Sequence, residues 1–407
     1  MASTSSRPPV QASGKATLSL SREVVGQFKP ARVFKDAVNN STASDSQGVS
    51  SPPRQPLQLT GIAFDDTGDR CVTTGEDDVF TVYDTRKGKR LTFLAESFER
   101  YTQRSTELHM PGLPIDGKTS STLRPRVIMQ FATTRCTTTS TYLTFKVILA
   151  REKHHVYASQ SLTFSVRSLQ MNPADDTFIS AGDDGTVRLW DLRQPTCRGL
   201  VNDVGGSTIA AFDSTGAVFA VACSANQTVM LFDSGSLDDS PFAHAALVDP
   251  ALAQISAPPP RPKFTSLSFS NNGAYLLVGT SSSVHYVLDA FDLNVVRRLE
   301  GHQGLGSLSG EEVCWSADSN WVLSGSIDGT IVAWDLTPPT GAAKLESVGR
   351  DRLAETLKPV TVLKAGDGQH APSRAVAFNP RYGMMGVGGE ELSFWLPAQA
   401  VEPEEGW

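Results

Sequence analysis

Adjacent acidic residues are the first groups in this sequence that could carry out chemistry. They occur as Asp77-Asp78, Asp183-Asp184 and Asp238-Asp239. Two neighbouring carboxyl groups can act as general acid and base or bind a metal ion. The first two pairs, however, stand at the same place in two similar stretches, where an acidic side chain caps a tight turn by accepting backbone N–H bonds. We therefore interpret Asp184 and the similarly placed Asp328 as structural, and we expect Asp238-Asp239 to be solvated.

Histidines and cysteines are the other groups with reactive or metal-binding chemistry. His244, His285 and His370 have no cysteine or paired acid at the spacing of metal ligands. The five cysteines are scattered and form no Cys-x-x-Cys pair, which predicts buried or free thiols. The patterns of a nucleophilic serine elbow, a phosphate-binding loop and a dinucleotide-binding glycine loop are absent from the sequence. The sequence therefore predicts no enzyme, no metal site and no cofactor.

The elements that carry these residues repeat along the chain. Residues 63–84, 171–191 and 314–335 share one pattern: a polar turn, an alternating strand, a second turn at Asp-Gly or Asp-Asp, and an apolar strand closed by an aromatic residue and Asp. Asp-Gly between alternating strands is a strong hairpin signal, because a two-residue turn needs positive φ. Weaker copies span residues 211–233, 268–289 and 377–397. The residues that close the six copies are Tyr83, Trp190, Phe232, Leu288, Trp334 and Trp395.

These repeats resemble the WD-repeat family, whose units begin near Gly-His and end at Trp-Asp. Gly301-His302 supplies the Gly-His, and Trp-Asp is intact at Trp190-Asp191 and Trp334-Asp335. The closing residues from Trp190 onward are spaced close to or above the roughly 40 to 45 residues of a propeller blade. The resemblance implies an all-β propeller, in which residues 29–37 should supply the outermost strand of the last blade. Six blades are legible and the interval from Tyr83 to Trp190 has room for another, so we expect seven.

Residues 95–165, where the second blade should lie, do not follow the repeat pattern. Two explanations stay open. One is a long disordered insertion in a surface loop. The other is a blade corrupted by a frameshift or a misannotated intron, because one permitted out-of-frame translation of residues 109–148 ends in the Gly-His expected of the family. Under the second explanation residues 151–165 are translated intron and the proper frame resumes near Val166.

From Phe28 to Pro397 the chain resembles, more narrowly, the WD-repeat subunit shared by the COMPASS SET-domain histone methyltransferase complex and the mRNA cleavage and polyadenylation factor. The matching stretches are residues 28–37, 172–200 and 378–397. The resemblance implies a non-catalytic scaffold in the nucleus that couples histone lysine methylation and transcript termination. Its implied partners are the methyltransferase, other COMPASS subunits and subunits of the polyadenylation factor. A substrate receptor of a cullin-ring ubiquitin ligase remains the alternative.

Two groups of residues are candidates for partner binding. Arg193 completes a Trp-Asp-x-Arg pattern with Trp190 and Asp191, which resembles the docking motif of cullin-ring ligase receptors. An exposed Arg193 would offer its donor fork to an acidic partner, whereas ordinary strand-end packing would bury Trp190 between blades and give Asp191 backbone donors. The second group is expected in a turn between blades, where it could contact phosphates of a phosphorylated RNA polymerase tail or of RNA, or form a solvated turn. It comprises Arg86, Lys87, Lys89 and Arg90.

The remaining singled-out residues are expected to be structural. The resemblance implies that His302 bonds to buried partners in its own blade, and we interpret Trp334 and Trp395, like Trp190, as structural. The chain has 36 Lys and Arg against 43 Asp and Glu, a formal net charge of -7. This balance disfavours direct sequence-specific DNA binding, and no apolar run approaches the roughly 20 residues that cross a membrane.

The expected domain boundaries follow from these patterns. Residues 1–27 form a disordered Ser-rich tail, and the propeller spans residues 28–398. Residues 39–56 are an inserted loop within it. Residues 399–407 form a C-terminal tail.

Overall fold

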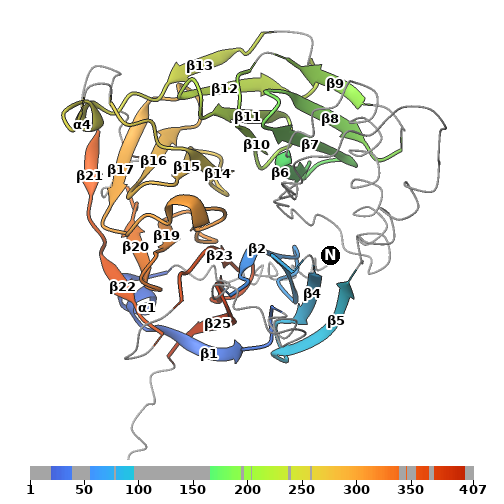
Figure 1. Ribbon diagram of the computed structural model, residues 1–407, viewed down its shortest axis with the longest axis vertical. Coiled ribbons are helices and arrows are strands. Elements are labelled where there is room, and N and C mark those ends of the chain that lie inside the picture. Colours follow the sequence, from blue (N-terminus) through green and yellow to red (C-terminus); the bar gives the residue numbers. More distant parts are fainter. Residues whose placement is uncertain are drawn as a thin grey trace, which may run out of the picture.

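The computed structural model describes residues 20–38, 56–77, 79–95, 166–193, 197–202, 204–236, 240–256, 259–338, 345, 354–365 and 371–398. These residues form six β-sheets that stand side by side around a centre, like the blades of a propeller (Figure 1). Every pair of neighbouring strands within a sheet is antiparallel except one. Most neighbouring strands are therefore joined as hairpins. The described part of the chain is therefore an all-β propeller.

The strands of the six sheets follow one another in chain order, with two exceptions described below. The first sheet contains β2 (Leu59–Phe64), β3 (Arg70–Gly75), β4 (Val79–Asp84) and β5 (Lys89–Ala95). The second contains β6 (Val166–Met171), β7 (Thr177–Gly182), β8 (Val187–Asp191) and β9 (Cys197–Val201). The third contains β10 (Thr208–Phe212), β11 (Val218–Cys223), β12 (Thr228–Asp233) and β13 (Ala243–Ala246).

The other three sheets include the strands that pair out of chain order. The fourth contains β14 (Phe264–Phe269), β15 (Tyr275–Thr280), β16 (Val284–Asp289), β17 (Val295–Glu300) and β21 (Glu355–Leu357). The fifth contains β18 (Val313–Trp315), β19 (Trp321–Gly325), β20 (Ile331–Asp335) and β22 (Thr361–Leu363). The sixth contains β23 (Ala375–Phe378), β24 (Met385–Gly388), β25 (Leu392–Pro397) and β1 (Phe28–Phe34). The helices are short: α1 (Arg22–Gly26), α4 (Pro250–Ala253) and the 3-10 turn η2 (Gly306–Leu308).

The described residues show six blades, whereas the sequence predicts seven. The innermost strands contact one another from sheet to sheet in the order β6, β10, β14, β18, β23 and β2. The predicted extra blade falls on residues 96–165, which lie outside the described residues and connect β5 to β6. The seventh blade and the frameshift therefore stay predictions.

Hairpin turns at Asp-Gly connect the second and third strands of the most regular sheets. Gly185, between β7 and β8, has φ +70°, and Gly329, between β19 and β20, has φ +76°. This left-handed conformation is open to glycine at no steric cost. At Gly185 space is also restricted, because a Cβ atom there would lie 2.8 Å from the Gly205 carbonyl oxygen. The repeated Asp-Gly of the sequence thus sets both the turn and the close approach of the next sheet.

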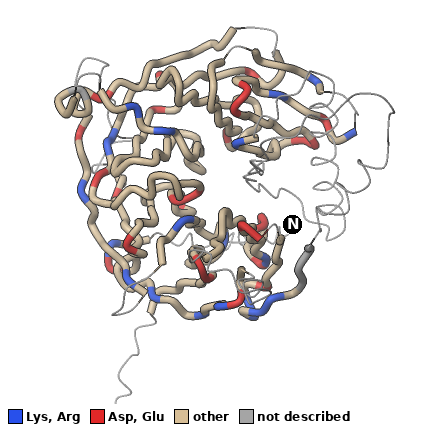
Figure 2. The backbone as a smooth tube through the Cα atoms, in the orientation of Figure 1, with Lys and Arg blue, Asp and Glu red and all other residues tan. Residues whose placement is uncertain are grey.

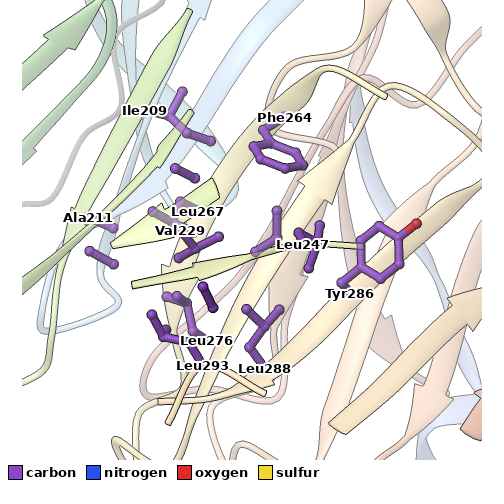
Figure 3. Packing of buried hydrophobic residues seen from close by; sticks show 14 of the residues in the cluster. Ile209, Ala211, Val229, Leu247, Phe264, Leu267, Leu276, Tyr286, Leu288 and Leu293 are labelled. Atoms are coloured by element: carbon purple, nitrogen blue, oxygen red, sulfur yellow. The ribbon is translucent and has the colours of Figure 1, made fainter. Parts of the chain in front are cut away.

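Most of the core lies between the sheets, and every repeat buries its closing residue. The six closing residues listed from the sequence lie on β4, β8, β12, β16, β20 and β25 and are at most 3% exposed. Figure 3 shows one cluster between the third and fourth sheets, where Ile209 and Val229 face Phe264 and Leu276. Burial of such side chains contributes about 1.5–3 kcal/mol each. Packing between the sheets therefore holds the blades together.

The two ends of the described chain meet in the sixth sheet. Strand β1 is its outermost strand and pairs antiparallel with β25, with Phe28 opposite Pro397 and Phe34 opposite Leu392. The expectation that residues 29–37 supply the outermost strand of the last blade agrees with this pairing. The pairing leaves β1 with one free edge on the outside of the ring.

The ordered structure begins earlier than the sequence predicts. Residues 20–27, assigned above to a disordered tail, include α1, which is capped by the Ser21 side chain. Leu20 is 6% exposed, and its carbonyl oxygen accepts a 2.8 Å hydrogen bond from Trp321 Nε1. The boundary at residue 27 is therefore too late by at least eight residues, because apolar Leu20 and Val25 are buried against the fifth and sixth sheets.

One segment ties two blades together at the outside of the ring. Its first part, β21, lies parallel to β17 as a fifth strand of the fourth sheet. Its second part, β22, is the outermost strand of the fifth sheet and pairs with β20. Figure 1 shows this segment running along the outer edge past both sheets.

Candidate partner-binding surfaces

The end of β8 carries the Trp-Asp-x-Arg pattern. Trp190 is 1% exposed, its Nε1 donates to Ser180 Oγ at 2.9 Å, and its ring stacks on Phe178. The described residues that pack around Trp190 all belong to the second sheet. Residues 96–165, which precede this sheet in the chain, lie outside the described residues, so the packing of Trp190 between blades stays a prediction.

Asp191 and Arg193 form a closed pair at the surface. Asp191 Oδ1 accepts from the Arg193 backbone nitrogen at 2.9 Å and from its Nε at 3.0 Å, and Oδ2 accepts from Nη2 at 3.1 Å. These bonds from Arg193 hold the Asp191 pKa below its ordinary value. The Arg193 side chain is 69% exposed, whereas that of Asp191 is 6% exposed. Arg193 thus stands exposed beside Asp191 with a fixed orientation, a geometry in which it can meet an acidic partner.

The basic group at residues 86–90 lies within one blade and not between blades, which corrects the expectation. These residues form the turn from β4 to β5, in which Asp84 pairs with Lys89 in register. The pattern was misleading because Tyr83-Asp84 ends a repeat in sequence, while the outermost strand of the same sheet follows it.

Three of the four basic side chains in this turn already have carboxylate partners. Arg86 Nε lies 2.6 Å from Asp69 Oδ1 and its guanidinium covers the Tyr382 ring. Lys87 Nζ lies 3.5 Å from Asp84 Oδ2. Arg90 Nη1 lies 3.3 Å from Asp36 Oδ2. Lys89 has no carboxylate partner among the described residues, so the turn offers less free positive charge than its sequence indicates.

Acidic side chains cap the turns as the sequence predicts. Asp184 Oδ1 accepts from the Thr186 backbone nitrogen at 3.1 Å, and Oδ2 accepts from Thr186 Oγ1 and Arg188 Nη2, both at 2.9 Å. Asp328 Oδ1 accepts from the backbone nitrogen and hydroxyl of Thr330 at 3.0 and 2.7 Å. Asp77 and Asp183 are described, whereas Asp78, Asp238 and Asp239 lie outside the described residues. The capping geometry leaves Asp184 and Asp328 engaged with their own turns.

His302 contacts the preceding blade, whereas the resemblance placed its partners in its own. Its Nε2 lies 3.0 Å from the Ser282 carbonyl oxygen in the β15–β16 turn, and its ring stacks on His285 of β16 with centroids 4.0 Å apart. Trp334 of the fifth sheet meets both rings edge-on. Burial lowers the His302 pKa to about 4 and holds that of His285 well below its ordinary value. Both imidazole rings are therefore uncharged, and they pack between the fourth and fifth sheets.

Sequence reasoning missed Glu311 and Glu312, although they form an adjacent acidic pair just before β18. Glu312 is 1% exposed; its Oε2 accepts from the Gly310 nitrogen at 2.6 Å and its Oε1 from Thr265 Oγ1 at 3.0 Å. Burial raises the Glu311 pKa to about 8 and the Glu312 pKa to about 7. Two adjacent glutamates in a sequence do not indicate that they will be buried next to an innermost strand.

A buried ion pair lies close to these acids. Arg374 Nη1 lies 2.9 Å from Glu76 Oε1, and Arg374 Nε donates to the Leu308 carbonyl oxygen at 2.8 Å. Glu76 Oε2 in turn accepts from the Gln58 backbone nitrogen at 3.2 Å. These bonds connect the first, fifth and sixth sheets near the centre of the ring, so they serve the packing of the blades.

No cluster of three or more His, Cys, Asp or Glu with the spacing of a metal site occurs in the described residues. Cys71, Cys197, Cys223 and Cys314 are free thiols, and Cys136 lies outside the described residues. Among the described helices, none is long and apolar enough to cross a membrane. The arrangement is a set of rigid sheets with side chains engaged in turns and packing, and its exposed groups are suited to contacts with other molecules.

Comparison with known proteins agrees with this architecture. The family described as WD domain, G-beta repeat matches residues 152–191 and 293–335. The first match starts ahead of Val166, and both matches end at an intact Trp-Asp. The chain is a WD40-repeat β-propeller protein.

Several curated relatives are similar over most of the chain. WD repeat-containing protein 82 of Drosophila melanogaster is 27% identical over 376 residues, which are 92% of this chain and 96% of the relative. The Set1 complex component swd2 of Schizosaccharomyces pombe is 29% identical over 66% of this chain and 68% of the relative. The COMPASS component SWD2 of Saccharomyces cerevisiae is 26% identical over 83% of this chain and 90% of the relative. These relatives confirm the resemblance drawn from residues 28–397.

Proposed function

We propose that this chain is a non-catalytic WD-repeat scaffold subunit of a histone lysine methyltransferase complex of the COMPASS type. The observation that carries the proposal is the similarity to COMPASS component SWD2, which extends over 83% of this chain and 90% of the relative. The fold supports it, because a rigid ring of sheets presents many loops for protein contacts without reaction chemistry. Such a complex acts on chromatin, so the proposal includes residence in the nucleus.

The proposal extends to mRNA 3′-end processing and to the phosphorylated RNA polymerase tail. Its support is the sequence resemblance over residues 28–397 together with a basic turn at residues 86–90. In the structure Lys89 is the basic residue of that turn without a described carboxylate partner, so we assign it the main role in contact with phosphate. Charge reversal of Lys87 and Lys89 should weaken binding to a phosphorylated tail peptide. Unchanged affinity would remove this turn from the proposal.

Affinity purification of the tagged chain followed by mass spectrometry tests the scaffold assignment. Recovery of a SET-domain methyltransferase with its associated subunits supports it, and recovery of polyadenylation subunits supports the second role. Purification without either set contradicts the assignment.

The alternative is a substrate receptor of a cullin-ring ubiquitin ligase, and one geometric observation favours it. Arg193 is exposed and held by Asp191 in one orientation. Arg193→Glu should then abolish recovery of a cullin adaptor, whereas the matched variant Arg198→Glu on β9 should not. Recovery of methyltransferase subunits, unaffected by Arg193→Glu, would decide for the scaffold.

A further inference from the structure

One edge of the ring concentrates positive charge in an otherwise acidic protein. Residues 28–36 and 84–91 contain seven of the 36 Lys and Arg and two of the 43 Asp and Glu, while the whole chain carries -7. Figure 2 shows basic positions along β1 and the β4–β5 turn at this edge. Because positive charges outnumber negative charges at this edge, it attracts negatively charged partners.

The two basic segments form one surface. Arg32 of β1 lies against the β4–β5 turn, since a Cβ atom built on Gly88 would be 3.5 Å from Arg32 Cγ. The Phe34 and Tyr83 rings pack 4.7 Å apart beneath them, and Arg90 bonds to Asp36. The end of β1 is thus fixed against the first sheet, so the two basic segments lie side by side.

Four cations of this edge have no carboxylate partner among the described residues: Lys29, Arg32, Lys35 and Lys89. All four are exposed. They lie beside exposed aliphatic side chains, Val33 at 42% and Leu91 at 51%. We call these six residues the rim surface. Cations interspersed with aliphatic groups fit a partner that carries both acidic and apolar side chains.

Charged residues also protect free sheet edges from pairing with other chains, but that role does not explain the rim surface. The outermost strands β13 and β22 contain no charged residue apart from a histidine on β13. If edge protection required a run of cations in this fold, these strands would carry one too. The concentration of charge on β1 and β5 is therefore specific to this edge.

The protein contains a matching interaction elsewhere in its own sheets. Strand β21 lies along the outermost regular strand of the fourth sheet, β17, and brings Glu355 to Arg297, with Oε2 3.2 Å from Nη2. An extended segment with an acidic side chain is thus held at the outside of one blade by a backbone ladder and a basic residue. Strand β1 presents the same combination of free edge and basic side chains, without an occupant among the described residues.

We propose that the rim surface binds an extended acidic segment of a partner protein, with its carboxylates on Lys29, Arg32, Lys35 and Lys89. Single-stranded nucleic acid is the less suitable partner, because such sites stack bases on exposed aromatic rings. Here Phe28 and Phe34 are 2% and 8% exposed and cannot present their faces. The inference does not depend on which complex the chain joins, since binding of a defined peptide is measured directly.

The test uses the full chain and a fluorescein-labelled 12-residue peptide with six Glu interspersed with Val and Ser, measured by fluorescence anisotropy. We expect saturable binding that weakens about tenfold or more in the variant Lys29→Glu, Arg32→Glu, Lys35→Glu, Lys89→Glu, because each reversal turns attraction into repulsion. The matched control Lys358→Glu, Lys364→Glu alters two exposed cations on another edge and should change affinity less than twofold.

Two further probes separate the proposal from general attraction to anions. The same peptide with Gln in place of Glu should not bind, and a 12-nucleotide uridine oligomer should bind more weakly than the acidic peptide. Equal binding of the Gln peptide, tighter binding of the RNA, or loss of affinity in the control variant to the same extent would each overturn the proposal. Circular dichroism of every variant establishes that the sheets remain folded.

Discussion

The imidazole ring of His302 stacks on that of His285 with centroids 4.0 Å apart and an interplanar angle of 9°. The two rings come from the connection before β18 and from β16, so the stack joins the fourth and fifth sheets. His302 Nδ1 is buried and has no hydrogen-bond partner among the described residues. A proton added there would place a positive charge beside a second buried imidazole, away from water.

This stack predicts that the contribution of His302 to stability becomes unfavourable in mild acid. Because the His302 pKa is lowered to about 4, the unfolded chain binds more protons than the folded chain between about pH 6.5 and pH 4. The free energy of unfolding should therefore fall on acidification through this window, by about 2 kcal/mol from His302. In His302→Gln, urea denaturation at pH 7 and pH 4.5 should show a smaller difference. His244→Gln, at an exposed position, is the control; an unchanged difference in His302→Gln contradicts the prediction.

Burial of Glu312 predicts the opposite pH dependence, over a window that overlaps that of His302. Its folded pKa is raised to about 7, so the folded state binds more protons than the unfolded state between about pH 4.5 and pH 7. Stability from the neutral carboxyl is present below this window and is lost as the pH rises through it, on the order of 2 kcal/mol. Glu312→Gln keeps a neutral group of the same shape, so the loss between pH 5 and pH 8 should shrink. Glu355→Gln, whose side chain is 63% exposed, should retain the wild-type dependence.

Leu20 predicts that the segment before β1 is part of the folded domain. Its side chain is 6% exposed within the cluster that contains Trp321. Leu20→Ala should lower the free energy of unfolding by about 2–3 kcal/mol, because a buried leucine loses its contacts and leaves a cavity. The exposed position Val248→Ala should change it by less than about 0.5 kcal/mol. Equal stability of wild type and Leu20→Ala in guanidinium denaturation would show that this segment does not stabilise the ring.

The bonds of Asp184 allow the contribution of one turn cap to the free energy of unfolding to be predicted. Asp184→Ala removes the acceptors of Thr186 and the ion-pair partner of Arg188, and should cost about 1–2 kcal/mol. Asp184→Asn retains an oxygen for the Thr186 backbone nitrogen and should cost less. Thermal unfolding of both variants distinguishes capping from a purely ionic role, for which Ala and Asn would be equally destabilising.

Local signals in the sequence were sufficient for most of the blade architecture. Alternating strands, Asp-Gly turns and aromatic closing residues depend on neighbours within a few positions, so Trp190, Trp334 and Trp395 were placed correctly on buried strands. The β1 strand was also recognisable, through the resemblance of residues 28–37. These features are local in sequence, or are carried by the family pattern.

The features that escaped prediction depend on contacts between distant segments. The pairing of β21 with β17 and of Leu20 with Trp321 leaves no periodic trace in either partner. The pairing of Arg90 with Asp36 likewise neutralises a charge that the sequence of the turn leaves open. Candidate binding residues were therefore harder to assign than strands, because exposure and charge balance are decided by what lies opposite in space.

The pairing of β1 with β25 has a consequence for how the protein is made. Among the described strands β1 comes first in the chain and β25 comes last, so the ribosome makes β1 long before its partner. Strand β1 therefore stays without its partner while the strands of the other five sheets are made. A chain that stops before Leu392 would therefore leave both β1 and β24 without the strand that lies between them.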